Sequence, residues 1–181
     1  MAIRRKLIRA LAEGVLEKQH VKHAPVPIDR IVQSLGIELK FDEVDDDLSG
    51  FLFRDTDGKK IVIGTNRNHH PNRQRFTIAH ELGHFFLHKG QRVHLDEERV
   101  AFRINRRDST STKGEDDEER EANLLAAELL MPAKFLANDL KGKDLDLLGE
   151  DDGFLQKLAD KYGVSSQALT FRLANLGYIE A

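Results

Sequence analysis

The sequence predicts an α+β fold in which a small, mainly antiparallel three-stranded sheet packs on one central helix. Three observations predict it: apolar residues recur at helical spacing towards both ends of the chain, short β-rich runs lie between residues 37 and 65, and a strongly apolar helical segment follows them. The 181 residues are 40% hydrophobic and 33% charged, which is typical of a globular chain with a sizeable core.

The first half of the chain is predicted to contain two helices and then the sheet. Apolar residues at helical spacing predict helices at residues 3–19 and 28–36. The basic residues of the first helix are expected to form a solvated face: Arg4, Arg5, Lys6 and Arg9. An acidic run separates the first two strands, and an Asp-Gly pair, typical of a tight turn, separates the last two. The three β-rich runs are residues 37–41, 50–55 and 59–65.

The second half is predicted to be mainly helical. Residues 73–89 form the central helix, while residues 107–118 are small, polar and acidic, which predicts a mobile loop. A second helix with an apolar face, residues 118–130, ends just before Pro132. Three shorter helices follow, at residues 133–140, 153–162 and 165–176.

Composition narrows the classes of function. The net charge of −3 is too small to indicate a nucleic-acid or anionic-membrane partner. The chain has no cysteine, so a transition metal would need histidine, aspartate or glutamate ligands. The basic N-terminus lacks the long apolar core of a signal peptide, and no apolar run approaches the length of a membrane span. We therefore expect a cytoplasmic protein with no membrane association.

The central helix contains the pattern H-E-x-x-H. His80 and His84 are four residues apart, so on a helix they share one face and can bind one metal ion. Glu81 follows His80, and in this pattern the glutamate can act as the general base of a metallopeptidase. The residues around the motif are apolar nearly all round, which predicts a buried helix whose histidines need a partner.

A catalytic metal site needs a third protein ligand, and the best candidates lie on helix 118–130. Glu118 and Glu119 project within the apolar arc of this helix, and Glu121 lies just outside it. Spacing therefore favours Glu119 and leaves the other two open. These glutamates can also simply favour the N-terminus of the helix electrostatically.

Several further residues are candidates for supporting roles. Asn123, one turn after Glu119, can hydrogen-bond a ligand imidazole. His88, one turn beyond His84, is predicted to support the site, since three ligands from one straight helix would be too far apart. A donor to the developing oxyanion is also needed. The sequence leaves four candidates open: Tyr162, Tyr178, His88 and His94.

Two segments, RFTIAHELGHFFLH (75–88) and EREANLLAAELLMP (119–132), resemble the ImmA/IrrE family of zinc metallopeptidases. Further similarity extends over roughly residues 25–178. The resemblance implies one Zn2+ per chain, bound by His80, His84 and Glu119, with Glu81 as the general base. It also implies that the substrate is a helix-turn-helix transcriptional repressor, whose cleavage derepresses a mobile element, a prophage or a stress regulon. Manganese or iron could also occupy a site of two histidines and one carboxylate.

The expected organisation is a zincin-like metallopeptidase domain with N-terminal helices, residues 1–140, and a helical subdomain packed on it, residues 141–181. The subdomain resembles a helix-turn-helix, and its predicted recognition helix offers Arg172 as its only cation. Direct DNA binding is therefore not expected. The alternative function is a DNA-binding or protein-binding regulator that holds metal without proteolysis. The intact Glu81 argues against it, because binding alone has no use for a base.

Overall fold

The computed structural model describes residues 3–43, 48–55, 59–88, 93–97, 113–142 and 152–179. Two helices, three consecutive strands, a helix and a fourth strand come first, and helices alone make up the last part, so the predicted α+β class is confirmed. The elements are α1 (Arg5–Lys18), α2 (Ile28–Ser34), β1 (Glu38–Asp42), β2 (Leu48–Arg54), β3 (Ile61–Asn66), α3 (Pro71–Leu87), β4 (Val93–Glu97), α4 (Lys113–Leu130), α5 (Ala133–Asp139), α6 (Asp152–Tyr162) and α7 (Ser166–Asn175).

The strands form one mixed sheet in the order β1-β3-β2-β4. β1 runs parallel to β3, whereas β2 is antiparallel to both β3 and β4. The three predicted strands are all present, and β4 adds a fourth at one edge. Its sequence, VHLDE, contains only two aliphatic residues, so it gave little apolar signal for a strand.

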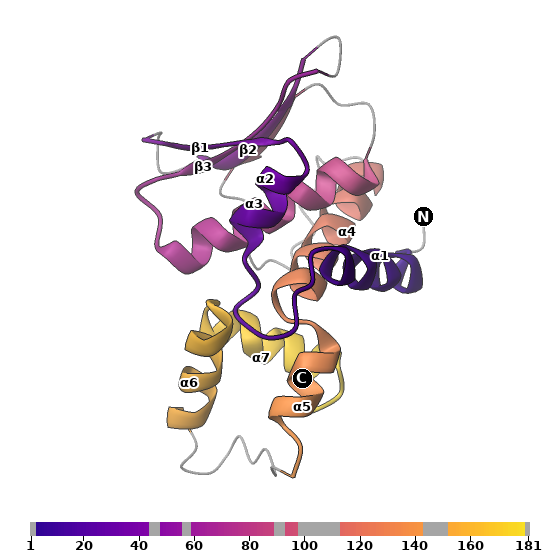
Figure 1. Ribbon diagram of the computed structural model, residues 1–181, viewed down its shortest axis with the longest axis vertical. Helices are drawn as coiled ribbons and strands as arrows, with labels where there is room; N and C mark the ends of the chain where they lie inside the picture. The colour runs from indigo at the N-terminus through magenta and orange to yellow at the C-terminus, as the bar shows by residue number, and fades with distance from the viewer. Residues whose placement is uncertain are drawn as a thin grey trace.

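Two glycines allow close packing at the sheet: Gly50 between β2 and α3, and Gly64 within the sheet. A Cβ on Gly50 would lie 2.3 Å from Cγ2 of Thr77 and 2.6 Å from the carbonyl oxygen of Gly64. A Cβ on Gly64 would lie 2.1 Å from the ring of Phe51. Only glycine fits at both positions. The contact at Gly50 brings β2 close to α3, so that the sheet lies against one side of this helix (Figure 1), and Gly64 makes room for the ring of Phe51.

The prediction of a loop over residues 107–118 was wrong for its last part. Helix α4 begins at Lys113, five residues before the predicted start, and residues 107–112 lie outside the described part of the chain. The run from Glu115 to Glu119 is acidic. Its negative charge favours the positive end of a helix dipole, an effect that composition alone does not reveal.

The C-terminal helices are tied to the rest of the molecule by buried polar contacts. Arg172 of α7 donates to both carboxylate oxygens of Glu128 on α4, at 3.0 and 2.6 Å, and to the carbonyl oxygen of Met131. Arg75 of α3 donates to the carbonyl oxygen of Gly163. Figure 1 shows α5, α6 and α7 grouped at the end of the molecule opposite the sheet. Among the described helices, none is long and apolar enough to cross a bilayer.

Candidate metal centre

Helix α3 carries the H-E-x-x-H pattern into the core. It begins with Pro71 at its first turn, and the backbone N–H of Asn72 donates to His70 Nδ1, which caps the helix. His80 and His84 are 3% and 2% exposed, and Glu81 is fully buried. The apolar surface predicted all round this helix is therefore covered, by the sheet on one side and by α4 on another.

Three side chains converge on one point. The Nε2 atoms of His80 and His84 lie 3.1 Å apart. Glu119 reaches them from α4: its Oε2 lies 3.4 Å from Nε2 of His80, and its Oε1 lies 3.2 Å from Nε2 of His84. Among the described residues, this is the group of three side chains that could hold a metal ion.

The spacing of these atoms fits a metal ion. For a tetrahedral ion with ligands about 2.0 Å away, the ligand atoms lie about 3.3 Å apart. The three observed separations, 3.1, 3.2 and 3.4 Å, bracket that value. Two imidazoles and one carboxylate also leave a fourth coordination position open, as catalytic sites require.

Close packing of α3 against α4 brings Glu119 to the histidines. A Cβ on Gly83 would lie 2.8 Å from the Cα of Ala122 and 2.9 Å from its carbonyl oxygen. The two backbones therefore touch where Gly83 meets Ala122. Ala122 lies one turn after Glu119 on α4, and Gly83 lies between the two histidines on α3. A larger residue at this position would push α4, and Glu119 with it, away from the imidazoles.

Asn123 orients the first histidine. Its side-chain Oδ1 lies 3.0 Å from Nδ1 of His80. An amide oxygen only accepts, so Nδ1 of His80 carries the proton and Nε2 presents its lone pair towards Glu119 and His84. This is the contact that the position of Asn123, one turn after Glu119, predicts.

The other two glutamates of the predicted set lie elsewhere. Glu121 binds Arg4 of the N-terminal segment, whose Nε lies 2.9 and 3.1 Å from its two oxygens. These hydrogen bonds lower the pKa of Glu121 to about 2. The hydrogen bond with Glu121 raises the pKa of Arg4, and the charge of the half-buried Glu118 adds a smaller contribution in the same direction. Arg4 is 45% exposed, as the expected solvated face of the first helix predicts, but its guanidinium also binds this buried carboxylate.

His88 lies behind the second histidine. Its Nδ1 is 3.1 Å from Nδ1 of His84, and its Nε2 is 3.4 Å from Oε2 of Glu121. It occupies the C-terminal cap of α3 and is not one of the three converging side chains. Its neighbours are thus a ligand candidate on one side and a carboxylate on the other.

Sequence reasoning missed Arg54, at the end of β2. Its guanidinium donates to the carbonyl oxygens of His84 and His88, at 2.9 and 3.2 Å, and so binds the C-terminal end of α3. It also lies 5.9 Å over the ring of Phe85. Burial lowers the pKa of Arg54, and the charge of Glu81 opposes that shift. A cation directly after the apolar run GFLF was the available signal.

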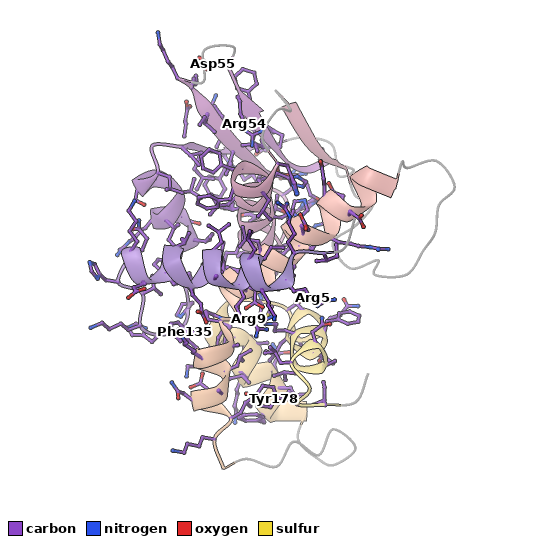
Figure 2. The ribbon with its side chains drawn as sticks, turned by 90° about the vertical axis from the view of Figure 1, so that its right-hand side faces the viewer. Arg5, Arg9, Arg54, Asp55, Phe135 and Tyr178 are labelled. Atoms are coloured by element: carbon purple, nitrogen blue, oxygen red, sulfur yellow. The ribbon has the colours of Figure 1, made fainter. Side chains whose placement is uncertain are left out.

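Two of the four predicted oxyanion donors are not near the centre. The hydroxyl of Tyr162 donates to Oδ2 of Asp139 on α5, at 2.9 Å, and burial together with Asp139 raises the pKa of Tyr162. Tyr178 lies at the opposite end of the molecule from Arg54 (Figure 2). The side chain of His94 lies outside the described part of the structure. His88 is engaged as described above.

The fold and the donor set define a metallopeptidase-like domain: a buried H-E-x-x-H helix, a carboxylate from the next helix, and a small sheet that packs on the first of these helices. A family model described as the IrrE N-terminal-like domain of the Peptidase M78 family matches residues 32–174. The chain belongs to this family, which confirms the resemblance seen in the sequence.

Comparison with solved structures supports the fold. A Mycobacterium tuberculosis transcriptional regulator aligns with a TM-score of 0.60 and 18% sequence identity, over 92% of this chain and 46% of that one. This chain therefore spans about half the length of the regulator. At that identity, the likeness concerns the fold. No curated protein matches the sequence.

Proposed function

We propose that this protein is a zinc-dependent endopeptidase that cleaves a helix-turn-helix transcriptional repressor. The observation that carries the proposal is the convergence of His80, His84 and Glu119 with Glu81 buried on the same helix. Membership of a peptidase family supports the reaction class. The substrate class and its consequence, derepression of a mobile element, prophage or stress regulon, rest on the family resemblance.

In this proposal, His80, His84 and Glu119 hold the zinc ion. When bound, zinc polarises the scissile carbonyl and lowers the pKa of the attacking water. Glu81 accepts a proton from that water on a carboxylate oxygen as the oxygen–carbon bond forms. It then delivers the proton to the amide nitrogen as the carbon–nitrogen bond breaks, so that protons balance over the cycle. The burial of Glu81 keeps bulk water from competing for this proton.

A second candidate is a regulator that holds metal without proteolysis. The DNA-binding form of this alternative is weakened by Arg172, the only cation of the predicted recognition helix. Arg172 is 3% exposed and its guanidinium binds Glu128 and the carbonyl oxygen of Met131, so it is buried out of reach of a DNA phosphate. The version of this alternative that is left to test is a regulator that holds metal and binds a protein partner without cleaving it.

The first measurement is metal content. Elemental analysis of metal-replete, desalted wild type is expected to give about one zinc per chain, and Glu119→Ala much less, with both proteins folded by circular dichroism. A folded wild type without zinc would overturn the proposal. Zinc retained in Glu119→Ala would keep the centre but move the third ligand to another carboxylate.

The second measurement is cleavage. Zinc-loaded protein is incubated with purified helix-turn-helix repressors from the same genome, and intact-mass spectrometry reads the products. Wild type should convert one repressor into two fragments whose masses sum to substrate plus water. Glu81→Gln, which keeps the shape of the side chain and removes the base, should lower the rate by roughly 100- to 10,000-fold. Binding of a repressor by both proteins without fragments would favour the metal-holding regulator.

A further inference from the structure

We propose that Arg4, Glu121 and His88 form a positioning network that holds His84 with its Nε2 directed at the metal. The network crosses three segments of the chain: the residue before α1, the N-terminal half of α4, and the end of α3. It rests on the proposed function, since it assigns a role at the same centre. Arg4, Glu121 and His88 are not among the three side chains that converge on the metal site, so their role would be indirect.

The direction of each hydrogen bond follows from the chemistry of its end points. If Nε2 of His84 gives its lone pair to a metal, Nδ1 of the neutral ring must carry the proton. Nδ1 of His84 lies 3.1 Å from Nδ1 of His88, so His88 accepts there. The proton of His88 is then on Nε2, which lies 3.4 Å from Oε2 of Glu121 and donates to it.

Glu121, at the far end of the network from His84, acts only as a hydrogen-bond acceptor. Oε1 of Glu121 accepts from the backbone N–H of Arg4 at 3.0 Å and from its Nε at 2.9 Å, and Oε2 is bound by the guanidinium as well. An ionised carboxylate held in this way donates nothing. The protons of the two imidazoles are thus assigned in one direction, from His84 through His88 to Glu121, while Arg4 donates to the same carboxylate from the other side. This assignment directs the lone pair of Nε2 of His84 at the ion.

The two histidines are therefore oriented by different means. His80 is oriented by one amide, Asn123, on the same helix as Glu119. His84 is oriented through a second imidazole by an ion pair whose arginine comes from the N-terminal segment, 117 residues away from Glu121 in sequence. The side chain of Glu121 is 8% exposed and that of Arg4 is 45% exposed, so the network runs from the centre to the surface.

A purely structural role is the competing explanation, because Arg4 and Glu121 also join α1 to α4. The chain supplies a matched control. Arg9 of α1 binds Glu128 of α4 at 3.3 Å, and this second ion pair joins the same two helices without reaching a histidine. A structural role predicts that any loss of zinc affinity follows the loss of stability in each arginine variant, whereas a positioning role lowers the affinity at Arg4 beyond what its loss of stability explains.

The experiment measures zinc affinity by competition with a chromogenic chelator, on the full chain, for wild type, Arg4→Ala, Glu121→Gln and Arg9→Ala. Urea denaturation of the metal-free proteins records the change in stability of each. We expect Arg4→Ala and Glu121→Gln to bind zinc roughly 10- to 100-fold more weakly, and Arg9→Ala to stay within about twofold of wild type. The visible absorption of the Co2+-loaded proteins should change in the first two variants and not in the third.

The outcomes separate the inference from the function on which it rests. Equal affinities in all four proteins would overturn the network and leave the zinc site standing. Equal losses in Arg4→Ala and Arg9→Ala would also overturn it, in favour of a structural role. A folded wild type that binds no zinc would overturn the proposed function and the network together. Arg4→Lys, which restores a cation at the same carboxylate, should recover part of the affinity if the network is correct.

Discussion

Two glutamates of α4, one in the middle of the helix and one near its C-terminal end, form the same kind of ion pair and use it differently. Glu121 and Glu128 are seven residues apart, so they lie on one face of the helix, and both are buried. Each binds an arginine from the N-terminal part of the chain, Arg4 or Arg9. The third partner differs: Glu121 reaches His88 beside the metal centre, whereas Glu128 binds Arg172 of α7.

The difference shows that an arginine from the N-terminal part of the chain can be the main partner of one glutamate and a minor partner of another. Arg4 supplies most of the hydrogen bonds that Glu121 accepts, through its backbone and its guanidinium. At Glu128 the buried Arg172 supplies two short bonds, and Arg9 adds a single contact of 3.3 Å from a side chain that is 51% exposed. Arg4 is therefore the main partner of Glu121, beside the metal centre, whereas Arg9 is a secondary partner of Glu128.

The largest expected effect on stability is at Glu128. Glu128→Ala would leave the guanidinium of Arg172 buried without its carboxylate, which costs about 3–5 kcal/mol. Urea denaturation should show this loss of unfolding free energy. A double variant, Glu128→Leu with Arg172→Met, removes both charges and should recover most of it. A single-variant loss below about 1 kcal/mol would show that the pair does not anchor α7.

The contact between α3 and α4 gives the next largest effect. Gly83→Ala places a methyl group 2.8 Å from the backbone of Ala122, which should cost about 1–3 kcal/mol and weaken zinc binding as Glu119 moves outwards. Gly14→Ala is the matched control, because a Cβ there meets no atom within 4 Å and a helical alanine should stabilise α1 by about 0.5–1 kcal/mol. Unchanged zinc affinity in Gly83→Ala would contradict the packing argument.

The local parts of this site could be predicted from the sequence. His80, Glu81 and His84 follow from one pattern on one helix, and the apolar residues around them predict burial. Helical spacing alone left three glutamates open as the third ligand, with Glu119 favoured, and the family resemblance then pointed to Glu119. Which of them faces the histidines depends on the rotation of α4 against α3, and that rotation is fixed by the Gly83 contact, which no local pattern contains.

The supporting cations could not be predicted for a similar reason. Arg4 and Arg54 find their partners 117 residues and about 30 residues away along the chain, and in sequence they look like ordinary surface residues. The edge strand β4 was missed because its few aliphatic residues do not alternate over a long enough run. The predicted helices, by contrast, depend on periodicity within each segment and agree with the structure to within a few residues, apart from the start of α4.

The pH dependence of stability tests the ion pair between Glu121 and Arg4, beside the metal centre. The pKa of Glu121 lies near 2 in the folded chain and near 4.5 ordinarily, so its ion pair contributes stability above about pH 4.5 and loses it as the pH falls towards 2. The difference in unfolding free energy between wild type and Glu121→Gln, metal-free, should be about 1–3 kcal/mol at pH 6 and shrink over that window. Arg4→Ala should remove most of the same dependence. A constant difference from pH 6 to pH 2 would exclude the ion pair as its source.

The smallest expected effect is at Arg9. Figure 2 shows Arg9 on the side of α1 that faces the C-terminal helices, where its Nε makes one long contact with Glu128. Because half of the side chain is exposed and Arg172 already satisfies Glu128, Arg9→Ala should cost less than about 1 kcal/mol by urea denaturation. The same substitution made in the Glu128→Leu, Arg172→Met background should cost close to nothing, since its partner is gone. A loss above about 2 kcal/mol in the wild-type background would mean that Arg9, like Arg4, is a principal partner of its carboxylate, and the two ion pairs of α4 would then be equivalent.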